Sequence, residues 1–149
     1  MAVNEAYNYK KWTENVDTSG VVSKEQLMQL SSEHYQAVIS LLPDSSPHAV
    51  AGEKQLVEQQ GLHYCYLPVD FAAPADSDYE QFESMLSKIQ REKTLIHCAA
   101  NYRVSAFAGI YSYKNLNWSA EKARQFMESL WDTREYPVWD QFVNRWLTE

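Results

Sequence analysis

The segment Leu95-Ile-His-Cys-Ala-Ala-Asn-Tyr-Arg-Val-Ser105 joins an apolar strand to a helix through a short polar turn. Thr94 to His97 predict a buried strand at the centre of a sheet, and the next helix is expected to begin near Arg103. This order places the Cys98 thiol at the carboxyl end of a strand, facing the N-terminus of a helix. Backbone N–H groups in such a turn point inward and bind anions, and the positive end of the helix favours a thiolate.

Cys98 and Arg103 together predict a binding site for a phosphate group. A thiolate attacks phosphorus or sulfur, and a guanidinium is always charged and binds two phosphate oxygens at once. Taken alone, Cys98 is better interpreted as a buried, inert thiol at a strand end. The neighbouring His97, Arg103 and Ser105, within a strand-turn-helix frame, favour the reactive interpretation.

Outward from this segment, short apolar runs alternate with helical periods, which is typical of an α/β domain. We expect one domain over residues 1–149, built on a small, mostly parallel sheet of about four strands flanked by helices. The elements expected are strands at 37–42 and 63–69, helices opened by capping boxes at Ser23 and Ser77, a helix from Ser46-Pro47 to Gly61, a helix capped by Ser119, and a last helix presenting Trp139, Phe142, Val143 and Trp146.

Composition limits the classes of function. The 149 residues carry 13 Lys and Arg against 20 Asp and Glu, a net charge of −7, which disfavours nucleic acid as a partner. No apolar run approaches the roughly 20 residues that span a bilayer, and the N-terminus lacks the apolar stretch of a signal peptide. We therefore expect no membrane partner and a cytoplasmic location, although a signal peptide already removed would leave no trace.

Two cysteines are too few for a disulfide framework or a four-ligand zinc site. The sequence predicts a free reactive Cys98 in a reducing compartment, with no metal and no other cofactor. Cys65, inside a predicted strand, is expected to pack in the core. The alternative is that Cys65 traps oxidised Cys98 in a disulfide, which requires close Cα atoms.

His97-Cys98, a short loop, Arg103 and a nearby Ser resemble the signature of protein tyrosine and dual-specificity phosphatases. The chain is most similar to an uncharacterised bacterial branch of phosphatase-like proteins, relatives of which occur fused to β-lactamase-like hydrolases. The segments that follow the family's order are Ser19-Gly20, Ser23–Leu27, Val38–Asp44 and Tyr66–Asp70. The resemblance implies a protein-tyrosine-phosphatase-like fold and hydrolysis of a phosphoric monoester through a phosphocysteine intermediate.

The resemblance also implies roles for single residues. Cys98 is the nucleophile, Arg103 binds phosphate, and an Asp on an earlier loop protonates the leaving group. The Asp that matches is Asp70, which follows the strand ending at 68–69. Asp76 and Asp78 on the same loop are its rivals, and the alternative role for Asp70 is to cap its turn.

Other residues near the loop have expected roles of lesser weight. Ser105 is expected to donate a hydrogen bond to the Cys98 sulfur, which would help the thiolate leave, with a bond to backbone as the alternative. His97 is expected to brace the loop through a backbone contact. Asn101 and Tyr102 are expected to point outward at the mouth of the site, with Tyr102 offering a stacking face. The residues expected to bind substrate are Ala99, Ala100, Asn101, Tyr102 and Arg103.

The loop departs from the family pattern in its length. The usual phosphatase motif has five residues between Cys and Arg, whereas Cys98 and Arg103 are separated by four. Ser105 keeps the usual distance from Cys98, and Val104 stands where the Arg would be. A loop of this size is found in rhodanese-like sulfurtransferases, where the Cys carries a persulfide. Three hypotheses follow: a phosphatase acting on a phosphoprotein or small phosphomonoester, a sulfurtransferase, and a phosphate-binding module without turnover.

Overall fold

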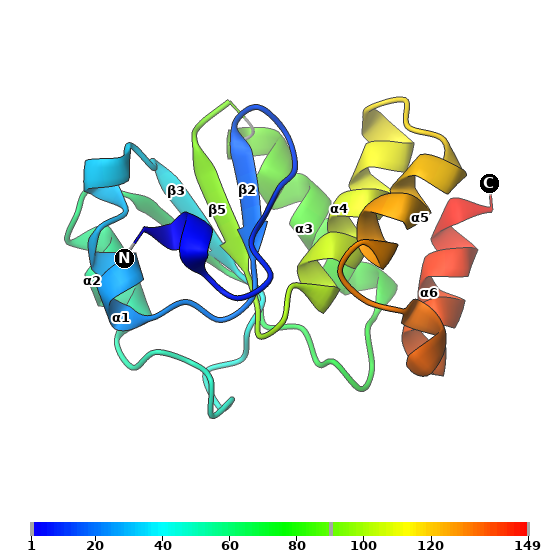
Figure 1. Ribbon diagram of the computed structural model, residues 1–149, viewed down its shortest axis with the longest axis horizontal. Helices are drawn as coiled ribbons and strands as arrows, with labels where there is room; N and C mark the ends of the chain where they lie inside the picture. The colour runs from blue at the N-terminus through cyan, green and yellow to red at the C-terminus, as the bar shows by residue number, and fades with distance from the viewer. Residues whose placement is uncertain (1, 90, 149) are drawn as a thin grey trace.

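The computed structural model describes residues 2–89 and 91–148, and a five-stranded sheet lies between two groups of helices (Figure 1). The strand order is β1-β2-β5-β3-β4; β1 is antiparallel to β2, and all other pairs are parallel. The strands are β1 (Lys10–Lys11), β2 (Val16–Ser19), β3 (Ala37–Ser40), β4 (His63–Tyr66) and β5 (Thr94–His97). The prediction of a mostly parallel α/β sheet with the strand at Thr94 in its centre is confirmed.

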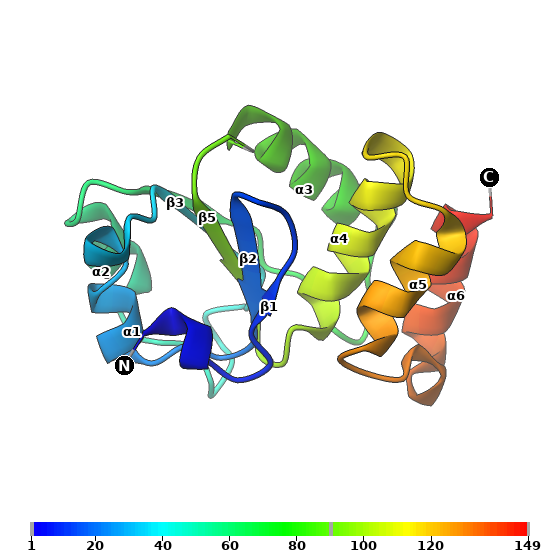
Figure 2. The same cartoon turned by 45° about the horizontal axis from the view of Figure 1, so that its top comes forward.

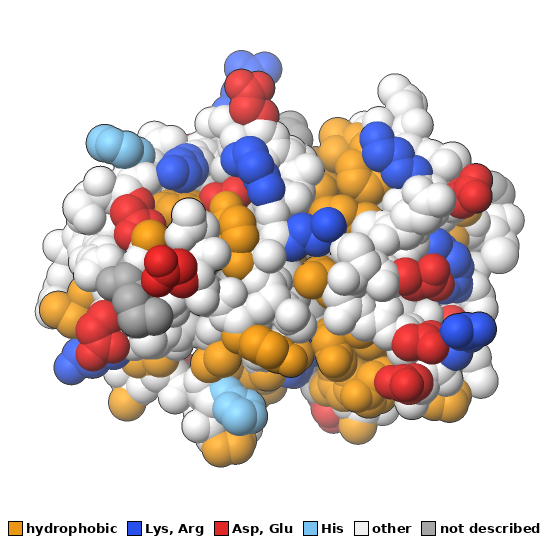
Figure 3. All heavy atoms as spheres, in the orientation of Figure 1, with side chains coloured by type: hydrophobic (Ala, Val, Ile, Leu, Met, Phe, Trp, Pro, Cys, Tyr) orange, Lys and Arg blue, Asp and Glu red, His pale blue; other side chains and the backbone are white. Residues whose placement is uncertain are grey.

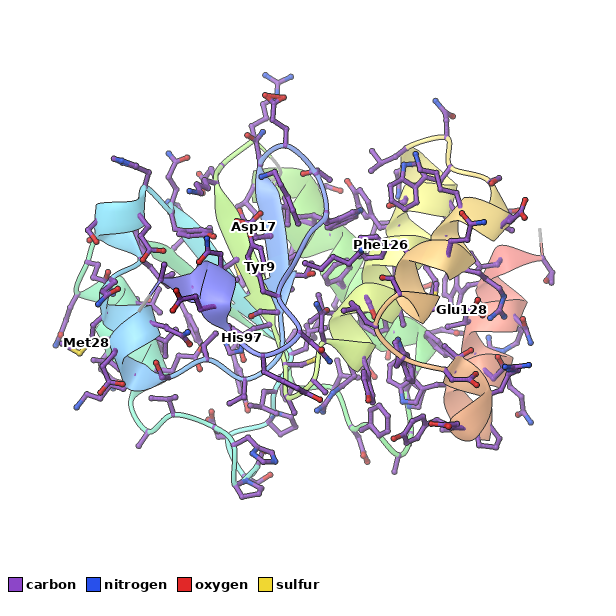
Figure 4. The ribbon with its side chains drawn as sticks, viewed as in Figure 1. Tyr9, Asp17, Met28, His97, Phe126 and Glu128 are labelled. Carbon is purple, nitrogen blue, oxygen red and sulfur yellow. The ribbon has the colours of Figure 1, made fainter. Side chains whose placement is uncertain are left out.

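The sheet has two strands, β1 and β2, that the pattern did not predict. β2 reads Val16-Asp-Thr-Ser19, with a single aliphatic residue, yet all four residues are buried because the strand pairs with β5. Tyr35 donates a hydrogen bond of 2.5 Å from its hydroxyl to the buried Asp17 carboxylate. Tyr9 lies beside Asp17 (Figure 4), and burial, followed by the charge of Asp17, raises the pKa of Tyr9 to about 12.

Six α-helices in the described part of the chain cover the two faces of the sheet. α1 and α2 lie on one face and α3 to α6 on the other, with α5 and α6 outermost (Figures 1 and 2). No helix among the described residues has the length and apolar character needed to cross a membrane. The helices are α1 (Lys24–Met28), α2 (Glu53–Glu58), α3 (Asp76–Ile89), α4 (Tyr102–Asn115), α5 (Ala120–Glu128) and α6 (Pro137–Leu147), with short 3₁₀ turns η1 (Val3–Glu5), η2 (Ser31–Glu33) and η3 (Thr133–Glu135).

A hydrophobic core lies on each face of the sheet. The central strands contribute side chains to both cores, because successive side chains point to opposite faces. Val38 of β3 and Leu95 of β5 pack in the smaller core under α1 and α2. Ile39 and Ile96, one residue further along each strand, pack in the larger core under α3 to α6. A strand buried on both faces therefore carries apolar residues on both, as Leu95 and Ile96 of β5 do.

Of the four helix starts expected at Ser23, Ser46-Pro47, Ser77 and Ser119, two are confirmed and two are wrong. Ser23 forms a complete capping box with Gln26, and the Ser119 side chain caps α5. The helix expected from Ser46-Pro47 begins only at Glu53, because residues 46–51 form turns and Gly52 enters the helix at a φ of 73°.

The other wrong start is the capping box at Ser77. α3 begins one residue earlier, at Asp76, so Ser77 already lies inside the helix. The Asp78 carboxylate instead accepts a 3.0 Å hydrogen bond from the Ala75 N–H. A short side chain in the first turn thus satisfies a free backbone donor in a way that the sequence pattern did not distinguish.

α4 passes through the larger core, and every residue from Arg103 to Ser112 is buried. Phe107, midway along α4, is fully buried in a ring of aromatic side chains. Its ring centroid lies 5.4–6.1 Å from those of Tyr79, Phe82, Trp139 and Phe142. These contacts fix α4, and therefore its N-terminal turn, against α3 and α6.

Phe107→Ala should lower the free energy of unfolding by about 3–5 kcal/mol, because it removes a large buried ring and leaves a cavity. Urea denaturation followed by circular dichroism measures this change. Val138→Ala, at a side chain that is 44% exposed, is the control and should change stability by less than about 0.5 kcal/mol. A loss below 1 kcal/mol for Phe107→Ala would contradict the packing described for α4.

Candidate active site

Cys98 and Arg103 line one cavity at the carboxyl end of the sheet. Cys98 directly follows β5, is fully buried, and donates its N–H to the Ser19 carbonyl at 3.3 Å. Arg103 lies in the first turn of α4 and is only 8% exposed. The cavity has a volume of about 150 Å³, and its lining residues are Phe71, Cys98, Ala99, Ala100, Tyr102, Arg103 and Tyr136. The structure thus brings the predicted nucleophile and the predicted phosphate ligand together.

The Arg103 guanidinium faces the site and not solvent. Its Nη1 donates a 2.8 Å hydrogen bond to the Val69 carbonyl, and its Cζ lies 5.5 Å from the centre of the Phe71 ring. Its Nε is buried and has no hydrogen-bond acceptor within residues 2–89 and 91–148. A buried donor without a partner is unfavourable, so this N–H is well placed to bind an anion that enters the cavity.

The N-terminus of α4 is open toward the loop. Asn101 precedes the helix in the left-handed conformation, with a φ of 69°. Its side chain does not cap α4 within the described structure; it donates to the Asn8 carbonyl at 2.8 Å and to Thr18 Oγ1 at 2.9 Å. The first N–H groups of α4 also lack intrahelical acceptors and remain available to a ligand. The prediction that Asn101 points outward at the mouth is wrong, because its side chain is fully buried behind the loop.

The loop after Cys98 packs directly on the backbone that follows β2. Val21 donates its N–H to the Ala99 carbonyl at 2.8 Å. A Cβ on Gly20 would lie 2.7 Å from the Ala99 carbonyl oxygen, 2.9 Å from Ala100 Cα and 2.9 Å from the Tyr7 carbonyl oxygen. Gly20 is required here because three backbone atoms, from two neighbouring segments, leave no room for a side chain.

Asp70 lies beside the cavity. Its side chain is exposed, and its Oδ1 accepts a 2.9 Å hydrogen bond from the Ala72 N–H. With Arg103 and Phe71 it lines a second cavity of about 540 Å³, adjacent to the first. Asp70 therefore caps its turn and also faces the space next to the phosphate-binding arginine, so the two roles considered for it are compatible.

The two rival aspartates are bound elsewhere. Asp76 Oδ1 accepts a 2.9 Å hydrogen bond from Arg145 in α6. Asp78 accepts from the Ala75 N–H at the start of α3. Neither lines the two cavities that contain Arg103. Of the three aspartates, Asp70 is the one that lines a cavity together with Arg103.

His97 braces the loop, but through a different partner from the one predicted. Its Nε2 lies 2.6 Å from Glu53 Oε2 of α2, and both side chains are buried. Its Nδ1 has no hydrogen-bond partner among the residues that the structure describes. Figure 4 shows His97 at the end of β5, directly before the loop. The expected backbone contact is replaced by a carboxylate from a helix 44 residues earlier in the chain, which no local pattern indicated.

Ser105 does not serve Cys98 in this arrangement. Its hydroxyl donates to the Tyr102 carbonyl at 3.2 Å and accepts a 3.0 Å hydrogen bond from Trp131 Nε1. A hydroxyl has one proton, so Ser105 has none to direct at the Cys98 sulfur. The predicted Ser–Cys hydrogen bond is therefore wrong, and the alternative, a bond to backbone, is what the structure shows.

Aromatic rings form one wall of the site. Tyr102 stacks on Trp131 with ring centroids 4.5 Å apart and an interplanar angle of 4°. Phe71 packs edge-on against Tyr136 at 5.2 Å. Burial raises the pKa of Tyr102, so its hydroxyl is neutral across the physiological range. Phe71 and Tyr136 were not predicted as site residues. For Phe71, the available signal was a lone aromatic residue directly after Asp70, in a loop of Ala and Pro.

Cys65 lies too far from Cys98 for a disulfide. β3 separates β4 from β5, and the register aligns Cys65 with Ile39 and Ile39 with Ile96. Two strand spacings amount to about 9.5 Å, which exceeds the roughly 7 Å limit between bridged Cα atoms. The hypothesis that Cys65 traps oxidised Cys98 is therefore wrong, and Cys65 packs against the larger core as predicted.

Solved structures identify the family. A protein named "Putative phosphatase (DUF442)" from Shewanella putrefaciens CN-32 is 31% identical, covers 97% of this chain and 91% of its own, and superposes with a TM-score of 0.86. The chain belongs to the DUF442 family. No family model matches the sequence of the present chain. The predicted similarity to a branch of phosphatase-like proteins is confirmed, whereas a link to β-lactamase-like hydrolases stays a prediction.

More distant structures share the fold. A variant of TpbA from P. aeruginosa, solved in complex with pTyr, is 17% identical to the present chain. The match covers 91% of the present chain and 82% of the TpbA chain, with a TM-score of 0.73. The core catalytic domain of the PP-IP phosphatase SIW14 from S. cerevisiae, in complex with citrate, is 16% identical, covers 96% of each chain and has a TM-score of 0.65. A biotin synthase from Heliobacterium modesticaldum is 26% identical over 125 residues, and the matched region spans 37% of that curated relative.

Gly20→Ala should weaken binding of inorganic phosphate by about tenfold or more, because the loop must move away from the new Cβ. Overpacking at this contact should also lower stability by about 1–3 kcal/mol. Isothermal titration calorimetry and urea denaturation measure the two effects. Gly61→Ala is the matched control: its φ of 82° strains an Ala by about 1–2 kcal/mol, but Gly61 lies at the other end of the sheet, before β4. Equal phosphate affinity in both variants would contradict a role for Gly20 in shaping the loop.

Proposed function

We propose that this DUF442 protein hydrolyses aryl phosphomonoesters through a phosphocysteine formed on Cys98. The observation that carries the proposal is the shared cavity of Cys98 and the buried Arg103, at the uncapped N-terminus of α4. Arg103 and the loop amides supply fixed positive charge for the phosphate oxygens, and this charge stabilises the transition state more than the ground state. The site needs no clustered surface cations, which agrees with the net charge of −7.

The first step transfers the phosphoryl group to sulfur. Cys98 Sγ attacks phosphorus, a sulfur–phosphorus bond forms, and the bond from phosphorus to the aryl oxygen breaks. Asp70, in its protonated form, gives its proton to the departing oxygen. General-acid assistance of this kind is worth typically ~10²–10⁴-fold in rate.

The second step regenerates the enzyme. A water oxygen attacks phosphorus, the bond to sulfur breaks, and Cys98 leaves as a thiolate. The Asp70 carboxylate accepts a proton from the attacking water and returns to its starting state. Inorganic phosphate is released, and Arg103 holds the phosphoryl oxygens through both steps.

The aromatic wall favours an aryl leaving group. Phe71, Tyr102 and Tyr136 line the Cys98 cavity, and aromatic faces stack on flat rings. The complex of a TpbA variant with pTyr, on the same fold, supports this assignment. The substrate is a phosphorylated protein or a small phosphomonoester.

Cys98→Ser should abolish turnover of phenyl phosphate, because a serine hydroxyl is a far weaker nucleophile than a thiolate. Asp70→Asn should lower kcat by about 10²–10⁴-fold, since the amide cannot donate the proton. Asp76→Asn, at the first residue of α3, is the matched control and should retain kcat within about twofold. Steady-state kinetics of phosphate release measure all three, and full activity of Cys98→Ser would refute the mechanism.

The loop length favours one second candidate, a sulfurtransferase that carries a persulfide on Cys98. Transfer of sulfur from thiosulfate to cyanide would require Cys98 but not Asp70, because no leaving oxygen is protonated. We expect no thiocyanate from the wild-type protein under conditions where phenyl phosphate is hydrolysed. Thiocyanate production unaffected by Asp70→Asn would favour the sulfurtransferase, and phosphate binding without either turnover would favour a non-catalytic module.

A further inference from the structure

Two asparagines, Asn8 and Asn101, bind the loop that follows Cys98 to the N-terminal segment. Asn8 Nδ2 donates to the Ala100 carbonyl at 2.9 Å, and Asn101 Nδ2 donates to the Asn8 carbonyl at 2.8 Å. Both residues adopt the left-handed conformation, with φ of 53° and 69°. Asn tolerates this conformation better than most residues, and its amide offers the donor that each bond needs. The two segments lie 92 residues apart in the sequence and are tied by reciprocal bonds.

Hydrogen bonds from Val21 and Asn8 determine the direction of two peptide groups in the loop. In a trans peptide, the carbonyl of one residue and the N–H of the next point in opposite directions. The Ala99 carbonyl points to the Val21 N–H, so the Ala100 N–H points away from that segment. The Ala100 carbonyl points to Asn8, so the Asn101 N–H also points away from it.

The cavity lies on the side to which these N–H groups point. Ala99 and Ala100 line it together with Cys98 and Arg103, whereas none of its lining residues comes from 2–23. Two loop amides therefore face the cavity that Arg103 also lines. The Arg103 Nε is buried without an acceptor among the described residues. Convergent backbone donors next to a buried cation form a site for a tetrahedral anion.

We propose that Asn8 is a positioning residue of the Cys98 loop, which it orients by holding the Ala100 carbonyl so that the Asn101 N–H faces the bound phosphoryl group. This role rests on the proposed function. The loop has four residues between Cys98 and Arg103 and lacks glycine. A side chain from the N-terminal segment therefore holds it in place from outside.

Two variants remove the donor in different ways. Asn8→Gly accommodates the positive φ but has no amide, and Asn8→Asp keeps the size of the side chain but presents a carboxylate that cannot donate to Ala100. The matched controls are Asn117→Gly and Asn117→Asp. Asn117 is exposed, has a φ of 63°, and follows α4 at the end remote from Cys98.

For both Asn8 variants we expect kcat/KM for phenyl phosphate to fall by about 10–100-fold, with most of the loss in kcat, because removing a transition-state donor outright lowers kcat by ~10²–10³-fold. The inhibition constant of inorganic phosphate should rise by about tenfold. The urea midpoint of Asn8→Gly should lie slightly below that of Asn117→Gly, because only the former loses a hydrogen bond. The Asn117 variants should retain kcat/KM within twofold. Retention of kcat/KM and phosphate inhibition within twofold by both Asn8 variants would overturn the proposal.

An amide-resolved measurement separates this proposal from the proposed function. In ¹⁵N-labelled wild-type protein, inorganic phosphate should shift the Ala100 and Asn101 amide resonances, and these shifts should shrink in Asn8→Gly but persist in Asn117→Gly. If the shifts behave in this way but phenyl phosphate is not hydrolysed, the phosphatase assignment fails and the positioning role stands. If hydrolysis occurs and Asn8→Gly leaves both shifts unchanged, the positioning role fails alone.

Discussion

The contact between the backbones that follow β2 and β5 is the constraint on which the site depends. The two strands run parallel as far as Ser19 and His97, and the segments beyond them stay in van der Waals contact because Gly20 has no side chain. The Ala99 and Ala100 carbonyls are bound on that side, by Val21 and Asn8. The loop can then present its N–H groups only to the opposite side, where the Cys98 cavity lies.

A single buried cation provides the charge of the site. Arg103 links the start of α4 to the segment that carries Asp70. It belongs to the first turn of α4 and donates to the Val69 carbonyl next to Asp70. The group proposed to bind the phosphate and the group proposed to protonate the leaving oxygen are thereby held at a fixed separation. Figure 3 shows hydrophobic side chains gathered along the edge of the molecule to which the strand arrows point in Figure 1. In such surroundings, a fixed charge acts more strongly than it does in water.

The helical half of the molecule supports the site and also supplies its wall. α4 is held by Phe107 in the aromatic core, and its N-terminal turn carries Arg103. Trp131, which follows α5, stacks on Tyr102 and donates to Ser105. Trp139 of α6 donates to the Phe71 carbonyl, which fixes the loop that follows Asp70. The C-terminal helices thus set the shape of the cavity as well as the stability of the fold.

Patterns within a few neighbouring residues were enough to predict several of the helices and strands. The apolar run at Thr94–His97, the helix that begins near Arg103 and the capping box at Ser23 follow from periodicity and from backbone donors that need partners. The pairing of Cys98 with Arg103 also followed, because a strand-turn-helix segment brings residues five apart to one turn.

The contacts between segments far apart in the sequence depend on how the whole chain packs, and they could not be predicted from local patterns. The polar strand β2 is buried because it pairs with β5, Glu53 reaches His97 from α2, and Asn101 turns inward to Asn8. Ser105, adjacent to the loop in sequence, is drawn to Trp131 and away from Cys98. A hydrogen bond depends on which partner the packed chain brings within reach, and local sequence does not encode that distance.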